Sequence, residues 1–295
     1  MAHEQISQFA IDLYPIADVG EETQYRLRNT PGEIQRPTVL EKSHKDLSVQ
    51  GDLISVVHGF YDEEGEAATL VVFQFRFLGS QIQRRRFRSA KIIISFGNGT
   101  SLGDILDPEV VCIAPDGEFI IDAASREVES AISGNLSATL GPFGAVGFGV
   151  GLGWERRTTT RKAGQSTLFG CRKTVERDYG KKNAAVWTLK ENKITGGGIP
   201  SFISTAILLK PQTAEDFQAI VTVDASADPL FSASTMARRL FGQLTVDPIH
   251  FSQMRAVMGP AIPNLDKNNL AAATKLLHEL GSVKVGSILV TFHET

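Results

Sequence analysis

The sequence predicts a mainly β protein: a β-sandwich, either one large sandwich or two tandem antiparallel ones, with a few short helices, one near the C-terminus. Three observations predict this class. β-Branched and aromatic residues are concentrated in short segments, polar and apolar residues alternate within several of them, and clusters of Gly, Pro, Asn and Asp separate them. Segments with helical periodicity are few, and the clearest lies late in the chain.

The clearest strand is Ala68–Leu78, ATLVVFQFRFL, in which Gln74 and Arg76 alternate with phenylalanines. This alternation is typical of a half-buried strand. We expect the strand to form a hairpin with Phe87–Phe96 across the long basic connection GSQIQRRR. A shorter strand at Asp52–Phe60 is expected to end before the turn DEEGE.

The later segments follow the same pattern of short runs and turns. Pro108–Ile121 holds two short apolar runs around a Pro-Asp-Gly turn, and Ser125–Ile132 reads as a short helix or a polar crossover. A helix is expected over 265–281, with Asp266 as its cap and Gly281 as its stop. The remaining predicted strands are Asn183–Leu189, Phe202–Leu209, Phe217–Val223 and 285–292.

The domain organisation leaves two alternatives open. A chain of 295 residues is long enough for one large or two ordinary domains. Between residues 122 and 134 the composition changes from aromatic strands to glycine and threonine. This change divides the chain into residues 1–125, an N-terminal β-sandwich part, and residues 126–295, a C-terminal glycine-rich β part with the C-terminal helix. The same stretch fits a crossover between the two sheets of one sandwich equally well.

The amino-acid composition limits which binding partners and which cellular compartment are expected. A formal net charge of -3 and a pI near 6.1 give no electrostatic reason to expect nucleic acid, and nothing in the totals favours an anionic surface. Cys112 and Cys171 are too few for a disulfide framework, which indicates a reducing compartment. The N-terminal residues lack a secretory signal, and no apolar run approaches the roughly 20 residues of a spanning helix. We therefore expect a cytoplasmic protein without an integral membrane segment, whose oligomeric state the sequence does not specify.

Motifs that force a mechanism are missing from the sequence. It holds no GxxxxGK[ST], HExxH, GxSxG or CxxC, and its six histidines never fall at metal-binding spacing, so no cofactor and no metal are expected. The strongest charge cluster consists of Arg84, Arg85, Arg86 and Arg88. We interpret it as a solvated hairpin loop rather than as a phosphate site, because the chain is mildly acidic and aromatic residues do not interleave with it.

Residues 144–154, GAVGFGVGLGW, place glycine at every second position from Gly147 to Gly153 with apolar residues between them. Three interpretations stay open: a membrane-inserting hairpin, close packing of another sheet on the glycine face, and the floor of an apolar ligand cavity. Close packing is the simplest of the three. A membrane hairpin lacks a return strand among residues 169–187, which are too charged for that purpose.

Several segments together resemble a group of filamentous-fungal β-rich proteins from biosynthetic clusters, of the norbornene-forming Diels-Alderase type. They are AATLVVFQFRFL, RRRFRSAKIIISF, DPEVVCIAPDGEF, the glycine-rich stretch ending in GWE, and AVWTLKENKITGGGIPSFISTAILLKP. The parts most specific to the group are IAPDGEF and the W-x-L-x-E-N…G-I-P segment. The resemblance implies a cofactor-free cyclase of fungal secondary metabolism that acts on an apolar terpenoid or polyene.

A pericyclic cyclisation suits a chain without catalytic motifs. Its barrier falls mainly because the protein holds diene and dienophile in a reactive fold, and one hydrogen bond to a carbonyl adds about 1 to 3 kcal/mol in a dry site. The candidate hydrogen-bond donors are Tyr14, His58 and Tyr61. The candidate substrate-binding residues are Phe148, Gly149, Gly151, Trp154 and Trp187.

The competing function is a non-enzymatic binding or interaction module, either lectin-like or membrane-associating. A module of this kind presents aromatic residues on exposed loops, whereas a cyclase encloses a small apolar substrate in a cavity. The sequence does not decide between the two, and both are compatible with a β-sandwich.

Overall fold

The structure is a computed structural model. It describes residues 28–44, 47–79, 86–98, 102–121, 166–193, 196–227, 244–254, 258–272, 281–285 and 288–291. All regular elements within these ranges are strands, and they form two antiparallel seven-stranded sheets. The mainly β class predicted from the sequence is therefore confirmed for the described residues.

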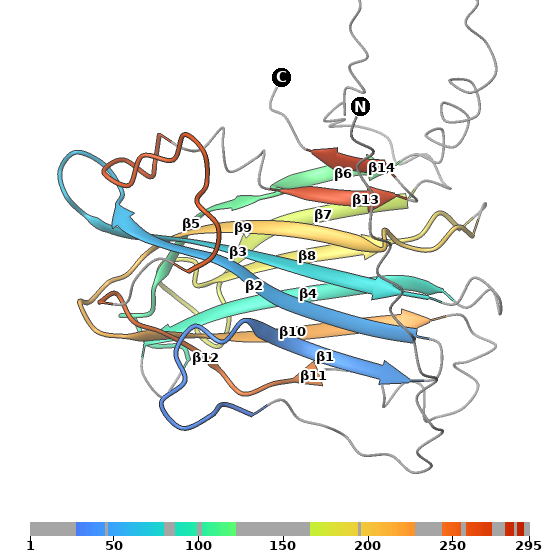
Figure 1. Cartoon of the computed structure of the whole chain (residues 1–295), viewed down its shortest axis with the longest axis horizontal. Helices are drawn as coiled ribbons and strands as arrows, with labels where there is room; N and C mark the ends of the chain where they lie inside the picture. The colour runs from blue at the N-terminus through green and yellow to red at the C-terminus, as the bar shows by residue number, and fades with distance from the viewer. Residues whose placement is uncertain are drawn as a thin grey trace, which may run out of the picture.

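Sheet A and sheet B each combine strands that are far apart in the sequence (Figure 1). Sheet A has the order β1 (Thr38–His44), β2 (Leu47–Phe60), β3 (Ala67–Leu78), β9 (Phe202–Lys210), β13 (Ser282–Val285), β14 (Ile288–Thr291), with β5 (Glu109–Ala114) also paired to β9. Sheet B has the order β11 (Leu244–Thr245), β10 (Phe217–Ala227), β4 (Phe87–Asn98), β8 (Ala184–Lys190), β7 (Ser166–Lys173), β6 (Gly117–Ile121), with β12 (Ile249–Phe251) also paired to β10.

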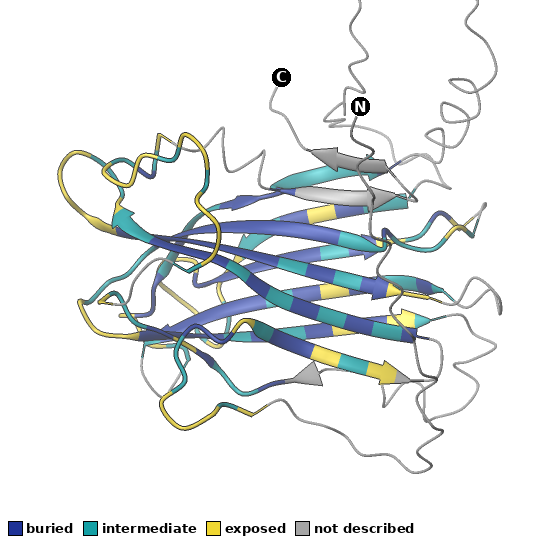
Figure 2. Cartoon of the chain, viewed as in Figure 1, coloured by how far each residue is buried: buried dark blue, intermediate teal, exposed yellow. Residues whose placement is uncertain are grey.

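The two sheets face each other across one apolar core, which gives the molecule a sandwich-like architecture. Side chains from the long strands of both sheets enter this core, and dark blue marks the buried residues in Figure 2. Phe73 and Phe75 contribute from sheet A, and Ile92, Phe96 and Trp187 contribute from sheet B, all fully buried. Burying one such side chain is worth about 1.5 to 3 kcal/mol, so this shared core is the main source of stability.

A second, smaller apolar cluster lies on the outer face of sheet A. Leu70 and Val72 alternate with the core residues of β3 and therefore point away from sheet B. Residues 258–272 cover this face and add Leu270 to the cluster. The cover lies close to β2, because a side chain at Gly59 would bring its Cβ within 2.3 Å of the carbonyl oxygen of Lys267.

The predicted hairpin between Ala68–Leu78 and Phe87–Phe96 is wrong. Both segments are strands, but β3 pairs with β2 and β9 in sheet A, whereas β4 pairs with β10 and β8 in sheet B. The connection 79–86 therefore crosses from one sheet to the other. Both strands bury aromatic or β-branched side chains in the shared core, so the two segments face each other across the sandwich and do not share a ladder.

The C-terminal helix expected over 265–281 is not seen in its described part. Residues 265–272 form turns, and 273–280 lie outside the described residues, as does Ser125–Ile132. The amides of Leu270 and Ala271 donate to the carbonyls of Phe60 and Tyr61 rather than to a preceding helical turn. Asp266 still caps locally, since its Oδ1 accepts from the amide of Asn268 at 2.9 Å.

The boundary between residues 1–125 and 126–295 falls within 122–165, which lies outside the described residues. Strands from before residue 122 and from after residue 165 occur in both sheets and share one core. The division into residues 1–125 and 126–295 stays a prediction. Among the described residues, no helix has the length and apolar character needed to cross a membrane.

Candidate functional site

Residues 122–165 leave and rejoin the sandwich on two neighbouring strands. β6 ends at Ile121 and β7 begins at Ser166, and these two residues lie opposite each other in an antiparallel ladder that runs back to Gly117 and Gly170. β7 is held on its other side by β8, with Thr167 opposite Lys190. The two ends of the segment are therefore fixed side by side, as the first residue pair of a longer hairpin would be.

A group of charged and polar residues holds this part of sheet B. Glu191, whose side chain is only 9% exposed, forms ion pairs with Arg86 Nε at 3.0 Å and with Arg88 Nε at 3.1 Å. Its Oε2 also accepts from the amide of Gly198 at 3.1 Å. The hydroxyl of Ser166 accepts from the amide of Asn192 at 2.9 Å. The Glu191 contacts join the end of β8 to the start of β4, and the Ser166 contact joins it to the start of β7.

The arginine cluster therefore differs from the solvated hairpin loop that the sequence predicted. Arg86 and Arg88 are half-buried, and both contact Glu191. They stand where the chain enters sheet B after crossing from sheet A, so they do not belong to a hairpin turn. Arg84 and Arg85 lie outside the described residues.

His58 faces the space between the sheets near the end of β2. Its Nδ1 lies 2.9 Å from Thr69 Oγ1, and its Nε2 lies 3.2 Å from Gln35 Nε2. An amide nitrogen only donates, so Nε2 accepts and Nδ1 carries the proton that it donates to Thr69. Both ring nitrogens are thus occupied by structural partners in the neutral form. The role of His58 as a hydrogen-bond donor to a substrate stays a prediction.

Acidification is expected to destabilise the fold through His58. Burial lowers the pKa of His58 below its ordinary value of 6.5, against a smaller opposing effect of Asp216. The unfolded chain then binds more protons than the native one, so stability is complete above about pH 6.5 and falls as the pH decreases toward the lowered pKa. Urea unfolding measured over this range should show the decrease in the native protein. His58→Gln, which keeps a polar side chain, should flatten it, and an unchanged slope in that variant would contradict the assignment.

Tyr61 lies on the opposite side of sheet A from His58. It packs against the outer cluster that contains Val57, and the ammonium of Lys210 stands 4.4 Å from the centre of its ring. Lys210 also pairs with Glu66, which raises the pKa of Lys210. The structure therefore does not bring Tyr61 and His58 into one site, and the role of Tyr61 as a donor stays a prediction.

The other predicted site residues are either buried in the core or outside the described part. Trp187 is fully buried, and its indole NH donates to the carbonyl of Pro115 at 2.9 Å. Gly170 permits this arrangement, since a Cβ there would lie 2.1 Å from that same carbonyl oxygen. Trp187 is thus a core residue in the described structure. Tyr14, Phe148, Gly149, Gly151 and Trp154 lie outside the described residues.

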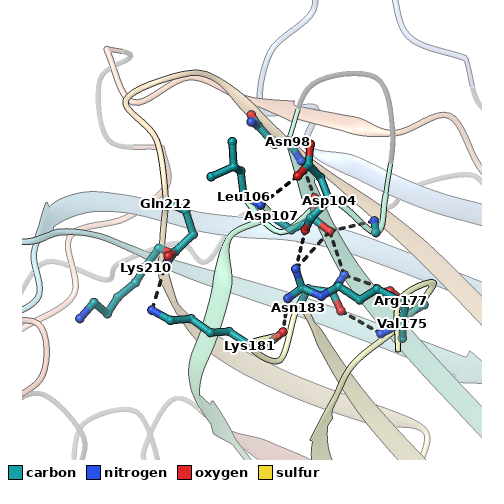
Figure 3. Close-up of polar contacts among 11 residues, drawn as sticks. Asn98, Asp104, Leu106, Asp107, Val175, Arg177, Lys181, Asn183, Lys210 and Gln212 are labelled. Carbon is teal, nitrogen blue, oxygen red and sulfur yellow. Dashed lines mark hydrogen bonds and ion pairs between the residues drawn. The ribbon is translucent and has the colours of Figure 1, made fainter. Parts of the chain in front are cut away.

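A buried carboxylate at the end of the sandwich away from the β6/β7 junction holds the connections 102–108 and 174–183 against the end of β4 (Figure 3). Asp107 is fully buried and accepts hydrogen bonds from the amides of Asn98 and Gly103 and from the side chain of Asn183, at 3.1, 2.9 and 3.1 Å. Arg177 Nη1 lies 3.9 Å from the same carboxylate. Every oxygen of Asp107 is thus engaged by donors of the chain itself, which indicates a structural role.

Sequence reasoning missed both of these carboxylates. Asp107 and Glu191 each lie in a connection beside other charged residues. The neighbouring residues in sequence do not distinguish a buried carboxylate that accepts several hydrogen bonds from one exposed to solvent. Within the described part of the chain, no three histidine, cysteine or acidic side chains are grouped so that they could hold a metal ion. The β6/β7 junction, with its Glu191 contacts, is the candidate functional site because residues 122–165 leave and rejoin the sandwich there.

Comparisons with known proteins leave the family open. No family model and no curated protein matches the chain. A solved structure described as a pore forming protein is similar with a TM-score of 0.29 and 10% identity, over 64% of this chain and 77% of that one. Clostridium perfringens delta-toxin is similar with a TM-score of 0.21 and 7% identity, over 75% and 93%. Similarities at this level support no argument about function, so the class is that of a mainly β protein with two antiparallel sheets.

Proposed function

We propose that this protein associates with lipid membranes and that residues 122–165 are the part that contacts lipid. The observation that carries the proposal is the position of this segment between β6 and β7, which are antiparallel neighbours with Ile121 opposite Ser166. Residues that extend from such a pair can continue the same ladder outward as a hairpin. This is the membrane-associating form of the non-enzymatic binding module considered from the sequence.

The amino-acid sequence of the segment supports the proposal. Residues 146–154 carry a large apolar side chain at every second position and residues 128–140 carry one at every fourth position. Gly141-Pro142-Phe143-Gly144, a typical turn sequence, lies between them. Each stretch is close to the roughly 9 to 11 residues that a strand needs to cross a bilayer. Small or polar residues occupy most of the positions between the apolar ones. The apolar side chains at even positions are Val128, Ile132, Leu136, Leu140, Val146, Phe148, Val150, Leu152 and Trp154.

The hairpin proposed here needs a return strand other than residues 169–187. Residues 169–187, considered above for that role, contribute to β7 and β8 of sheet B. The complementary stretch is 128–140, which precedes the glycine-rich one. In this pairing the glycines lie on the same side as the serine, asparagine and threonine residues of the first stretch.

Insertion of such a hairpin requires more than one copy of the chain. In hydrocarbon, the two outer edges of a lone hairpin would leave rows of amide and carbonyl groups without partners, each at a cost of several kcal/mol. Hairpins from neighbouring copies can pair edge to edge and remove that cost. We therefore propose association of several copies on the membrane, while the sandwich supplies a rigid base for each hairpin.

The test uses the emission of the two tryptophans. Lipid vesicles that carry a nitroxide quencher on their acyl chains are expected to quench Trp154, because it lies at an apolar position of the segment. Trp187 is fully buried between the sheets and should not respond. The signal is the fraction of total emission that quencher-labelled vesicles remove, compared with unlabelled vesicles of the same lipid.

Trp154→Phe is the matched control, since it keeps an apolar aromatic side chain and leaves Trp187 as the remaining tryptophan. The variant should lose the quenching while it still sediments with vesicles. Sedimentation of the native protein without any quenching of Trp154 would show surface binding alone and would contradict insertion. Failure to sediment with vesicles would contradict the proposed function.

The cyclase implied by the sequence resemblance stays a prediction. Four of its five candidate substrate-binding residues, Phe148, Gly149, Gly151 and Trp154, belong to the segment assigned here to lipid, and the fifth, Trp187, is a core residue. Protection of Trp154 from the lipid quencher, together with turnover of a polyene, would favour the cyclase.

A further inference from the structure

The connections between strands lie at two opposite ends of the sandwich. The strand register shows at which end each connection lies. At the β6/β7 end, where residues 122–165 leave, β4 begins and β8 ends, with Ser89 opposite Lys190. This end lies to the right in Figure 1. At the opposite end, β9 finishes next to the start of β3, with Leu209 opposite Thr69. The connections 61–66, 102–108, 174–183 and 211–216 lie at that opposite end.

The opposite end carries exposed acidic side chains in every one of these connections. They outnumber the exposed lysines there, Lys173, Lys181 and Lys182. Two pairs neutralise charge on both sides, because Lys181 Nζ lies 2.8 Å from Glu109 and Glu66 pairs with Lys210. Anionic surfaces would be repelled by this end. The exposed acidic residues are Glu63, Glu64, Glu66, Asp104, Glu176, Asp178, Glu215 and Asp216.

The β6/β7 end is cationic. Lys190 and Lys193 are exposed there. Farther into sheet B, Lys91 and Asp224 lie opposite each other and balance. The net charge of -3 thus conceals opposite signs at the two ends.

From this charge separation we infer that the β6/β7 end is a docking surface for anionic lipid. The inference rests on the proposed membrane association and adds the lipid class and the orientation. A negatively charged leaflet attracts each nearby lysine or arginine and repels the acidic end. Phosphates of nucleic acid would meet the same cations, but the membrane is favoured because the segment with alternating apolar residues leaves the sandwich at this end.

The test compares two charge-matched double variants of the full chain. Lys190→Gln with Lys193→Gln removes two exposed cations at the β6/β7 end, and Lys181→Gln with Lys182→Gln removes two at the opposite end. Binding is measured to phosphatidylcholine vesicles with and without phosphatidylserine. Each cation near an anionic surface strengthens binding roughly fivefold, so the first variant should weaken binding to phosphatidylserine vesicles roughly 30-fold. The second should bind at least as well as the native protein, and added salt should weaken all of the binding.

Each alternative result has a distinct meaning. Equal binding to both vesicle types, or an equal loss in both variants, overturns the inference and leaves the proposed membrane association standing. No binding to either vesicle overturns the proposed function as well. Binding to a DNA or RNA oligonucleotide with the same dependence on Lys190 and Lys193, and none to vesicles, assigns this surface to nucleic acid and also overturns the inference. Unfolding midpoints of the two variants that match the native value establish that the comparison is made on folded protein.

Discussion

Phe148→Asp is expected to reduce membrane insertion of the protein roughly 100-fold. Phe148 is the second of the five apolar residues that alternate from Val146 to Trp154, so in the proposed hairpin its side chain faces the hydrocarbon. A charged aspartate costs about 2.5 to 3.5 kcal/mol at the bilayer centre, which corresponds to about two orders of magnitude in the partition constant. The measurement is the vesicle concentration at half-maximal quenching of Trp154.

Ser137→Asp supplies the control for this prediction. Residue 137 lies at an odd position, where the segment carries small and polar residues, so the same aspartate would point away from lipid. We expect at most about a tenfold reduction there. Equal losses in the two variants would show that added charge alone opposes insertion, and native-like insertion of the Phe148 variant would contradict the hairpin. Circular dichroism of both variants establishes that the sandwich is intact.

The individual strands of the fold were easier to predict than their pairing. Ala68–Leu78 and Phe202–Leu209 are rich in apolar and β-branched residues, and both are strands with nearly the expected bounds. Their pairing with each other spans more than a hundred residues of sequence, and nothing local encodes it. The connection 79–86 has a length that suits a hairpin and a crossing between sheets equally well. The choice depends on which buried faces fit together, which a single sequence does not display.

Strand β7 was missed because its residues are poor strand formers when considered alone. It contains Gly170 and ends in Arg172 and Lys173, and both features argue against a strand in local statistics. In the structure Gly170 is required by close contact with the carbonyl of Pro115 and the ring of Trp187. Missing β7 also hid the site, because the position of residues 122–165 is informative only once their two flanking strands are known to pair.

The charge separation was equally invisible in the sequence. The totals of 30 basic and 33 acidic residues led to the expectation that nothing favours an anionic surface. Successive connections alternate between the two ends of a sandwich, so residues of opposite charge are sorted in space although they alternate along the chain. Glu191 illustrates the same limit, because its burial between Arg86 and Arg88 follows from strand pairing and not from any local pattern.

Asp107→Ala is expected to have the largest effect on stability, about 3 to 5 kcal/mol in the free energy of unfolding. The substitution removes a fully buried acceptor and leaves the amides of Asn98 and Gly103 without their partner. It also leaves Arg177, whose side chain is only 4% exposed, without a nearby carboxylate. Domains of this kind are stable by about 5 to 15 kcal/mol, so the loss is a large part of the total. Urea unfolding followed by circular dichroism measures it.

Asp104→Ala is the control for this prediction, because it removes a negative charge from the same connection without breaking the Asp107 hydrogen bonds. Asp104 is exposed, and its side chain accepts only from the amide of Leu106 at 3.2 Å, so the expected cost is below about 0.5 kcal/mol. A loss below 1 kcal/mol for Asp107→Ala would contradict the structural role assigned to that carboxylate. Because the network lies at the end of the sandwich opposite the β6/β7 junction, vesicle binding by the folded fraction of Asp107→Ala should match the native protein. Stability and membrane binding would then be separable properties of the two ends.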